Sequence, residues 1–146
     1  MIATFRLPRA RTLTALLFVS GACLTLAAPA ASATTPPPNA QAVCEDAART
    51  GYSLTEEAIS ADQAGQDATA ASYDTSAITA INPVTSDCYY VNPTNIYNEI
   101  LTSSENLQSA KSANSVGGTA SALSTEQSVA TVLYNVFLTL FNQGPQ

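Results

Sequence analysis

The chain has 146 residues, a length typical of one domain, with 11 acidic side chains, five basic ones and no histidine. The excess of negative charge disfavours nucleic acid as a partner, because a surface that binds nucleic acid must neutralise a row of phosphates. Without histidine the chain has no Ser-His or Cys-His catalytic pair and no imidazole ligand for a metal ion.

Residues 1–33 have the pattern of a secretory signal peptide. Three arginines precede an apolar segment over residues 13–26, and small side chains then form an Ala-x-Ala cleavage site that ends at Ala33. An uncleaved anchor is one alternative, but a membrane span needs roughly 20 apolar residues and Ser20 interrupts this run. A lipoprotein signal ending at Cys23 is the other. We expect cleavage, and therefore a secreted or extracytoplasmic protein.

Cleavage after Ala33 would remove 33 of the 146 residues, leave 113 and change the charge. The leader carries three of the five basic residues and none of the acidic ones. Eleven acidic and two basic side chains would remain, a formal net charge of −9. A charge of this size favours solubility and disfavours binding to anionic lipid headgroups. An acidic docking face for a cationic partner is the less favoured interpretation.

The mature chain would contain two cysteines, Cys44 and Cys88. An even pair in an exported chain most simply forms one disulfide bond, and two buried free thiols are the alternative. The pair lacks the Cys-x-x-Cys spacing of thiol-redox proteins. A bridge that closes a loop of about 45 residues would contribute roughly 4 kcal/mol to stability.

The disulfide limits how the helices can be arranged. After a Pro-rich lead-in over residues 34–39, which is predicted to be extended, residues 40–81 have a helical composition. One unbroken helix from Cys44 to Ile81 would be about 55 Å long. The residues from there to Cys88 reach back only about 25 Å, whereas bonded cysteines have Cα atoms within about 7 Å of each other.

The predicted helix over residues 40–63 must therefore end and the chain must fold back. Gly65 is the best position for this turn, with Asp67 as the N-cap of a second helix over residues 68–81. A break at Gly51 is the rival, because a capping box follows it. That break would leave the second arm too long to return easily to the disulfide.

A third helix is predicted after a proline-containing connection. Asn82-Pro83 ends the second helix, because a residue before proline avoids the helical conformation. A connection over residues 83–91 follows, and Asn92 then caps a helix that has Pro93 in its first position. Its predicted buried side consists of Ile96, Ile100, Leu107 and Ala110. Gly117-Gly118 is expected to end it.

The fourth predicted helix has the clearest periodicity. A capping box at Ser124 and Gln127 begins it and Gly144-Pro145 ends it. Between them, apolar residues recur three and four positions apart: Val129, Val132, Leu133, Val136, Phe137, Leu140 and Phe141. A strand over residues 129–141 is the competing interpretation, because β-branched and aromatic residues are frequent there.

Together these elements predict an all-α fold, a small antiparallel bundle of about four helices stapled by a Cys44–Cys88 disulfide. The bundle would form a single helical domain over residues 40–143. After cleavage of the signal peptide no segment is expected to span a membrane, because polar residues interrupt the fourth helix.

Carboxylates are the abundant groups that could carry out catalysis. Glu56 and Glu57 are adjacent, so on a helix their side chains point about 100° apart and do not form a preset pair. Residues 62–67 contain two aspartates but lack the alternating oxygen ligands of a calcium loop. We therefore predict no catalytic residue, no metal site and no cofactor.

Three tyrosines, Tyr89, Tyr90 and Tyr97, are clustered close to Cys88 and the start of the third helix. Tyrosine combines an apolar ring with a polar hydroxyl group and is frequent in binding surfaces. It also fills the ends of ordinary helical cores. The three tyrosines are a candidate binding surface.

The sequence favours a non-catalytic secreted module that binds an unknown protein or a small apolar ligand. The first alternative is a carrier that holds an apolar molecule between the helices, in a cavity lined by Val129, Leu133, Val136, Phe137 and Phe141. A further alternative is a small carboxylate-dependent hydrolase.

Overall fold

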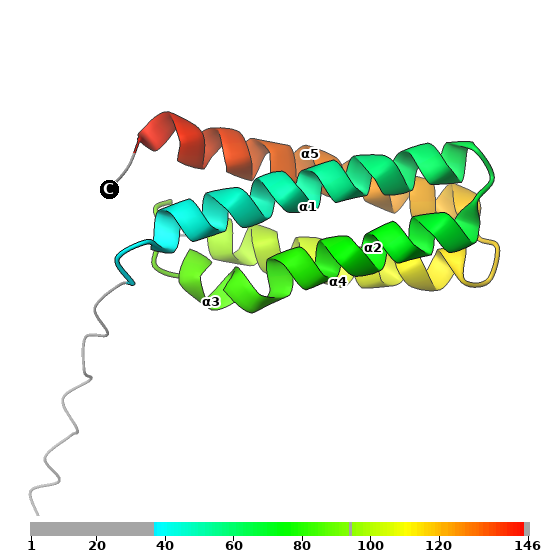
Figure 1. Cartoon of the computed structure of the whole chain (residues 1–146), viewed down its shortest axis with the longest axis horizontal. Coiled ribbons are helices and arrows are strands. Elements are labelled where there is room, and N and C mark those ends of the chain that lie inside the picture. The colour runs from blue at the N-terminus through cyan, green and yellow to red at the C-terminus, as the bar shows by residue number, and fades with distance from the viewer. Residues whose placement is uncertain (1–36, 94, 145–146) are drawn as a thin grey trace, which may run out of the picture. The chain divides into compact units, whose positions relative to one another are not determined.

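Four long helices pack side by side in the computed structural model (Figure 1), which describes residues 37–93 and 95–144. All of these residues belong to one unit of the chain, Thr34–Gln146. The elements in chain order are α1 (Ala40–Gln63), α2 (Asp67–Ile81), the 3₁₀ turn η1 (Asn82–Val84), the short helix α3 (Thr85–Cys88), α4 (Asn95–Asn114) and α5 (Thr119–Gln143). No strand occurs among the described residues, and the predicted all-α bundle is confirmed.

The predicted signal peptide, residues 1–33, and the first residues of the predicted lead-in lie outside the described part of the chain. Directly before α1 the lead-in forms a turn rather than an extended segment, because the Ala40 N–H donates to the Pro37 carbonyl oxygen at 3.1 Å. Across the residues that the structure describes, we find no helix with the length and apolar character that a bilayer span requires.

Neighbouring long helices run antiparallel. Both α1 and α4 pack on α2 and on α5. Asn114 hydrogen-bonds Asp74, and Ser104 hydrogen-bonds Asn82, so α4 runs opposite to α2. Gln41, in the first turn of α1, reaches the last turn of α5. The bundle therefore has a turn end, where the α1–α2 and α4–α5 turns lie, and a disulfide end, with α3, the beginning of α1 and the end of α5 (Figure 1).

The first turn is at Gly65, as predicted. Its φ of 69° lies in the left-handed region that glycine adopts without strain. The rival break at Gly51 is wrong, because α1 continues through that residue. A Cβ atom at Gly51 would lie 2.8 Å from Cγ2 of Ile81 and 3.2 Å from Cδ1 of Leu133. Glycine at this position instead lets α2 and α5 approach α1 closely.

Both predicted N-caps at the turn end are wrong. Asp67 is the first residue of α2 rather than its N-cap, and its Oδ1 accepts a hydrogen bond of 2.8 Å from Oγ1 of Thr119. Thr119 begins α5 ahead of the capping box predicted at Ser124. Ala122, which lies between them, is fully buried. The hydrogen bond to α2 and the burial of Ala122 extend the helix beyond the local capping signal.

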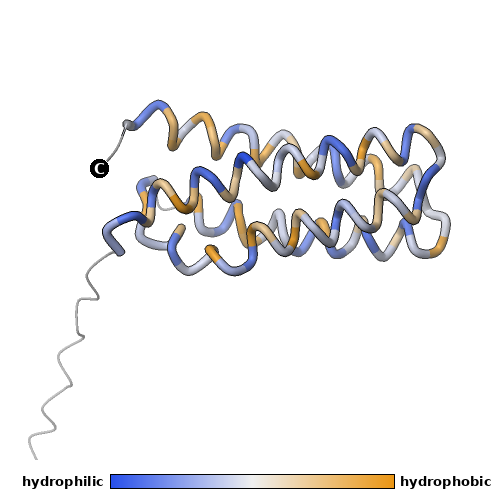
Figure 2. Tube along the Cα trace, viewed as in Figure 1, coloured by the Kyte–Doolittle hydropathy of each residue, from blue (hydrophilic) through white to orange (hydrophobic). Residues whose placement is uncertain are grey.

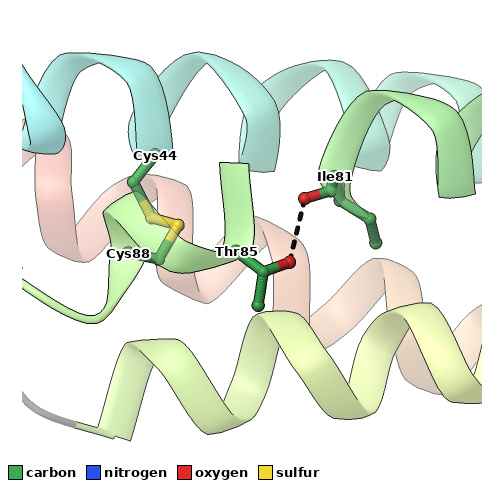
Figure 3. The surroundings of a disulfide bond; sticks show 4 residues. All are labelled: Cys44, Ile81, Thr85 and Cys88. Carbon is green, nitrogen blue, oxygen red and sulfur yellow. Dashed lines mark hydrogen bonds between the residues drawn. A yellow bond between two sulfur atoms is a disulfide. The ribbon is translucent and has the colours of Figure 1, made fainter. Parts of the chain in front are cut away.

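The predicted disulfide between Cys44 and Cys88 is present (Figure 3), with Cα atoms 5.3 Å apart and both residues fully buried. α2 ends at Ile81 as predicted, but the residues after it form η1 and α3 rather than an irregular connection. Oγ1 of Thr85 donates to the Ile81 carbonyl oxygen at 3.1 Å. This hydrogen bond continues the helical turns after α2 and brings Cys88 to α1.

α4 begins later than predicted. The predicted N-cap, Asn92, and the following Pro93 both precede the helix, which starts at Asn95. Val91 is 3% exposed and belongs to the same hydrophobic cluster as Cys88. Burial of Val91 turns the chain toward the core at a position where the local signal favours a helix.

Hydrophobic residues recur along all four long helices (Figure 2). The strand interpretation of residues 129–141 is wrong, because α5 is helical throughout. The main core cluster consists of Ala40, Cys44, Ala48, Ala77, Ile81, Cys88, Val91, Ile96, Ile100, Leu107, Val129, Leu133, Val136 and Leu140. A second cluster contains only alanines as buried members, Ala58, Ala61 and Ala70, and lies toward the turn end. At the turn end the buried apolar side chains are therefore mainly small, with Ile59 of α1 as a larger member.

Candidate functional sites at the two ends of the bundle

The disulfide end is a cross-linked frame made by three elements. The disulfide bond joins α1 to α3. Nε2 of Gln41, in the first turn of α1, donates hydrogen bonds to the carbonyl oxygens of Leu140 and Gly144, at 3.1 and 2.7 Å. The beginning of α1 is therefore held both to α3 and to the end of α5.

A pocket of about 660 Å³ opens on this frame. Its volume is within the range typical of sites for small molecules. The lining includes Pro37, Asn39, Glu45, Tyr90, Val91 and Phe141. Phe141 is 61% exposed, so much of an apolar ring faces solvent. Gln41 also lines the pocket, and its buried Oε1 has no hydrogen-bond donor. The pocket thus combines apolar surface with hydrogen-bond acceptors.

The three tyrosines of the candidate binding surface lie together beside this pocket. The ring centroid of Tyr89 is 5.5 Å from that of Tyr90 and 5.6 Å from that of Tyr97, and both contacts are edge-on. Tyr89 is 65% exposed, whereas the other two are partly buried. Of the three, Tyr90 lines the pocket. A role of this group in binding stays a prediction.

At the turn end four polar side chains meet, one from each long helix. We call Asp62 of α1, Asp74 of α2, Asn114 of α4 and Glu126 of α5 the polar cluster, and each is at most 3% exposed. Nδ2 of Asn114 donates to Oε1 of Glu126 at 3.1 Å and to Oδ2 of Asp74 at 3.4 Å. Asn114 therefore links α4 to both α2 and α5.

Five oxygen atoms of the polar cluster are buried without a hydrogen-bond donor. They are both carboxylate oxygens of Asp62, Oδ1 of Asp74, Oδ1 of Asn114 and Oε2 of Glu126. Burying an acceptor without a donor costs about 1–3 kcal/mol, and more when the group is charged. A proton on a carboxyl group converts one acceptor into a donor, so protonation would remove part of this cost.

Burial favours the protonated form of the carboxyl groups in the polar cluster. It raises the pKa of Glu126 to about 8, and the charges of Asp74 and Asp62 act in the same direction. Burial also raises the pKa of Asp74 to about 6, against the opposing effect of the hydrogen bond from Asn114. The pKa of Asp62 is raised by burial as well. Glu126 is therefore mainly protonated at neutral pH.

The polar cluster was not predicted, although the sequence contains a signal for it. A step of seven residues, two helical turns, separates Glu126 from buried Leu133 and Asp74 from buried Ile81. Extending each apolar row by this step would have placed both carboxyl groups inside the bundle. The predicted core considered only apolar side chains, so these two carboxyl groups were not placed.

Of the carboxylates considered from the sequence, Asp62 belongs to the polar cluster, whereas the adjacent pair on α1 lies elsewhere. Glu56 and Glu57 are both exposed on α1. Over residues 37–93 and 95–144, no three His, Cys, Asp or Glu side chains are grouped so that they could hold a metal ion. The predicted lack of a catalytic residue stays a prediction.

The five residues predicted to line a carrier cavity are distributed over different surroundings. Leu133 and Val136 belong to the main core cluster, and Phe137 packs against it partly buried. Val129 borders a pocket of about 230 Å³ between α4 and α5. Phe141 lines the pocket at the disulfide end. The structure therefore does not bring these five side chains around one space.

Comparisons with known proteins give no information on the function of this chain. No family model matches the chain, and neither the curated proteins nor the solved structures contain a significant match.

Proposed function

We propose that this protein is a secreted, non-catalytic binding module that takes a small amphipathic cation into the pocket at the disulfide end. The observation that carries the proposal is that one pocket combines an exposed aromatic ring, that of Phe141, with a carboxylate, that of Glu45. This pocket is built on elements that a disulfide bond and hydrogen bonds hold together.

The chemistry of the lining selects the class of ligand. Phe141 and Pro37 offer exposed apolar surface to the hydrocarbon part of a ligand. Glu45 attracts a positive group, and the aromatic faces of the lining add a cation–π attraction. An anionic ligand is disfavoured, because the whole chain has a formal net charge of −6.

The cross-linked frame supports binding. The contacts of Gln41 and the disulfide hold the lining in place before a ligand arrives, and a preorganised site loses less conformational entropy when it binds. Among the described lining residues Glu45 is the one carboxylate. The pair of carboxyl groups that glycoside hydrolysis needs is therefore not present in this lining, which favours binding over hydrolysis.

The proposed location rests on the leader and on the disulfide. Residues 1–33 have the pattern of a cleaved signal peptide, and disulfides persist in oxidising compartments. The intact mass of the protein recovered from its source, with and without reductant, tests both points. A mass that includes residues 1–33, or free thiols, would contradict them.

No specific observation favours the two alternative functions. A carrier cavity was expected where Leu133 and Val136 instead fill the core. The carboxyl groups of the polar cluster do lie together, but at most 3% of each of these residues is exposed. A substrate therefore has no direct access to them.

A titration followed by nuclear magnetic resonance tests the proposed ligand class. The probe is hexyltrimethylammonium, which joins a short alkyl chain to a permanent positive charge, and hexyl sulfate is its anionic counterpart. We expect hexyltrimethylammonium, and not hexyl sulfate, to shift the amide signals of residues 39–45, 90–91 and 141–144. Equal shifts from both probes, or shifts confined to other residues, would contradict the proposal.

Matched variants separate the pocket from the rest of the surface. Phe141 and Val116 are a matched pair, because their side chains are 61% and 83% exposed and neither belongs to the core. Phe141→Ala should weaken binding, whereas Val116→Ala should not. Glu45→Gln should likewise weaken binding, whereas Glu57→Gln, which removes an exposed charge from the same helix, should not. An equal effect within either pair would show that the probe does not occupy the pocket.

A further inference from the structure

We propose that the polar cluster is a pH-dependent switch for the turn end of the bundle. With its carboxyl groups protonated, the cluster holds the four long helices together there. When the protons dissociate, the turn end opens while the disulfide end stays closed. This proposal does not depend on the ligand proposed for the pocket, because it concerns residues at the opposite end of the bundle.

The side chains of the polar cluster lie so close together that the turn end can stay closed only while some of the carboxyl groups are protonated. Three carboxyl groups and one amide contribute seven oxygen atoms, and one side-chain nitrogen, Nδ2 of Asn114, donates to two of them. Asp62 is 3% exposed and neither of its carboxylate oxygens has a donor. Ionised carboxylates this close and this buried would repel each other and lack solvation. Protons shared among them remove both penalties.

The other charged groups that act on the cluster do not neutralise it. Lys111 of α4 lowers the pKa of Asp74, whereas Asp67, at the start of α2, raises the pKa of Asp62. From α1 and α5 the groups that face the cluster are Asp62 and Glu126 themselves. When all are ionised, four negative charges therefore stand against one positive charge.

The direction of the pH effect follows from the proton affinity of the closed state. Carboxyl groups of an open chain lose their protons near pH 4. In the closed bundle Glu126 has a pKa of about 8 and Asp74 a pKa of about 6. Between about pH 4 and about pH 8 the closed state holds more protons than the open state, so a rise in pH favours opening. Above this range both states are ionised and the effect levels off.

The effect should stay local because, besides the polar cluster, the turn end is held mainly by small side chains and by the hydrogen bond from Thr119 to Asp67. Most of its buried hydrophobic members, such as Ala58, Ala61 and Ala70, are small, with Ile59 as a larger one, and alanine buries less apolar surface than leucine or isoleucine. Most of the large aliphatic residues of the main core cluster and the disulfide lie farther along the bundle. Partial opening of a weakly packed unit is a common event below the free energy of global unfolding.

Amide hydrogen exchange of the disulfide-bonded protein tests the switch. We expect protection, corrected for intrinsic exchange, to fall about tenfold per pH unit between about pH 6 and about pH 8 for the release of one proton. The loss should affect residues 58–74 and 110–126 and spare residues 40–48 and 133–143. The chain has no histidine, so no imidazole titrates in this range.

Two further measurements test whether the carboxyl groups of the polar cluster cause the pH dependence. Glu126→Gln retains the size of the side chain and should remove most of the pH dependence between about pH 6 and about pH 8, whereas Glu57→Gln, on the exposed side of α1, should retain it. If the glutamine variant fails to fold, carbon-detected titration of the carboxyl groups in the unaltered protein replaces it. At least one of the three cluster carboxyl groups should then titrate above pH 6.

Several results would overturn the switch. One is protection that does not change with pH, and another is an equal loss at both ends, which would indicate global unfolding. A third is the absence of any carboxyl group that titrates above pH 6. Recovery of protection at about pH 8 on addition of calcium chloride would show that a cation, rather than protons, closes the cluster.

Discussion

The two ends of the bundle are closed by different means. At the disulfide end, Cys44 and Cys88 are covalently joined, and large aliphatic residues such as Leu140 fill the space between the helices. At the turn end, alanines, Ile59 and the four residues of the polar cluster occupy the equivalent positions. A disulfide bond and aliphatic side chains do not titrate, whereas burial raises the pKa of Glu126 in the second arrangement to about 8.

α5 shows most directly what this difference teaches. Glu126 and Leu133 lie on the same buried face of one helix, two turns apart. The leucine stabilises the bundle at any pH, because its contribution comes from hydrocarbon removed from water. The glutamate stabilises it only while the carboxyl group is neutral or well paired. One helix can therefore make one stabilising contact that does not depend on pH and another that does, without any change in backbone structure.

Removal of the disulfide should have the largest effect on stability. The double variant Cys44→Ala/Cys88→Ala should lower the free energy of unfolding by about 2–5 kcal/mol, because the bond closes a long loop in the unfolded chain. Urea denaturation followed by circular dichroism measures this change. The loss should be accompanied by faster hydrogen exchange at the disulfide end. A loss below about 1 kcal/mol would mean that the core alone closes this end.

The pH dependence of global stability should be the next largest effect. Between about pH 6 and about pH 8 the folded chain keeps a proton on Glu126 that the unfolded chain has lost, so stability falls as pH rises. One proton corresponds to about 1.4 kcal/mol per pH unit, and we expect a total of about 2 kcal/mol over this range. Urea midpoints recorded at constant ionic strength measure the slope.

The Glu126→Gln variant is the control for this change of stability with pH. Glu126→Gln cannot ionise, so its stability should be nearly flat over the same range and should exceed that of the unaltered protein at the alkaline limit. A slope that persists in this variant would assign the titration to another group. The terminal amine, which titrates near pH 8, is the group to examine next.

The parts of the fold that the sequence predicted are those set by more than one constraint. The turn at Gly65 follows from the lengths of the two helices, the Cys44–Cys88 distance and the preference of glycine for a positive φ, which all agree. The end of α1 was predicted for the same reason, whereas the end of α2 at Ile81 was predicted from the proline that follows it. Where a helix end was predicted from one local signal alone, contacts with other parts of the chain often moved it.

Long-range contacts explain the helix ends that were wrong. Asp67 was expected to cap α2, but its carboxylate accepts a hydrogen bond from Thr119, which is 52 positions later in the chain. The start of α4 was displaced by the burial of Val91. The polar cluster was missed because a carboxyl group alone in a sequence is usually solvated. Only the packing of four helices shows that Glu126 is surrounded by other polar groups.

Gly51→Ala should have a smaller effect, confined to the middle of the bundle. The added methyl group would lie 2.8 Å from Ile81 and 3.2 Å from Leu133, so α2 or α5 must move outward. Overpacking of this kind costs about 1–3 kcal/mol, and we expect the lower part of that range, since alanine also favours the helix. Thermal denaturation measures the loss. Gly65→Ala serves as a comparison, because the added methyl group would have open space around it, whereas the positive φ at this position is unfavourable for alanine.

The smallest expected effect concerns the pocket and tests whether the two ends are independent. Glu45→Gln should weaken the binding of hexyltrimethylammonium by at most about fivefold, because exposed charge pairs contribute about 0.2–1 kcal/mol. The probe carries its charge at every pH. Its affinity for the unaltered protein should therefore stay constant between about pH 6 and about pH 8, even as the turn end loses protection.

A change of affinity in step with that loss would contradict the independence of the two ends. It would mean that α1 and α5, which run from the polar cluster to the pocket, transmit the opening along their length. Glu126→Gln distinguishes this from a direct effect of pH on the pocket. If the variant removes the change in affinity, the ends are coupled through the helices. If the change persists, the pocket itself responds to pH.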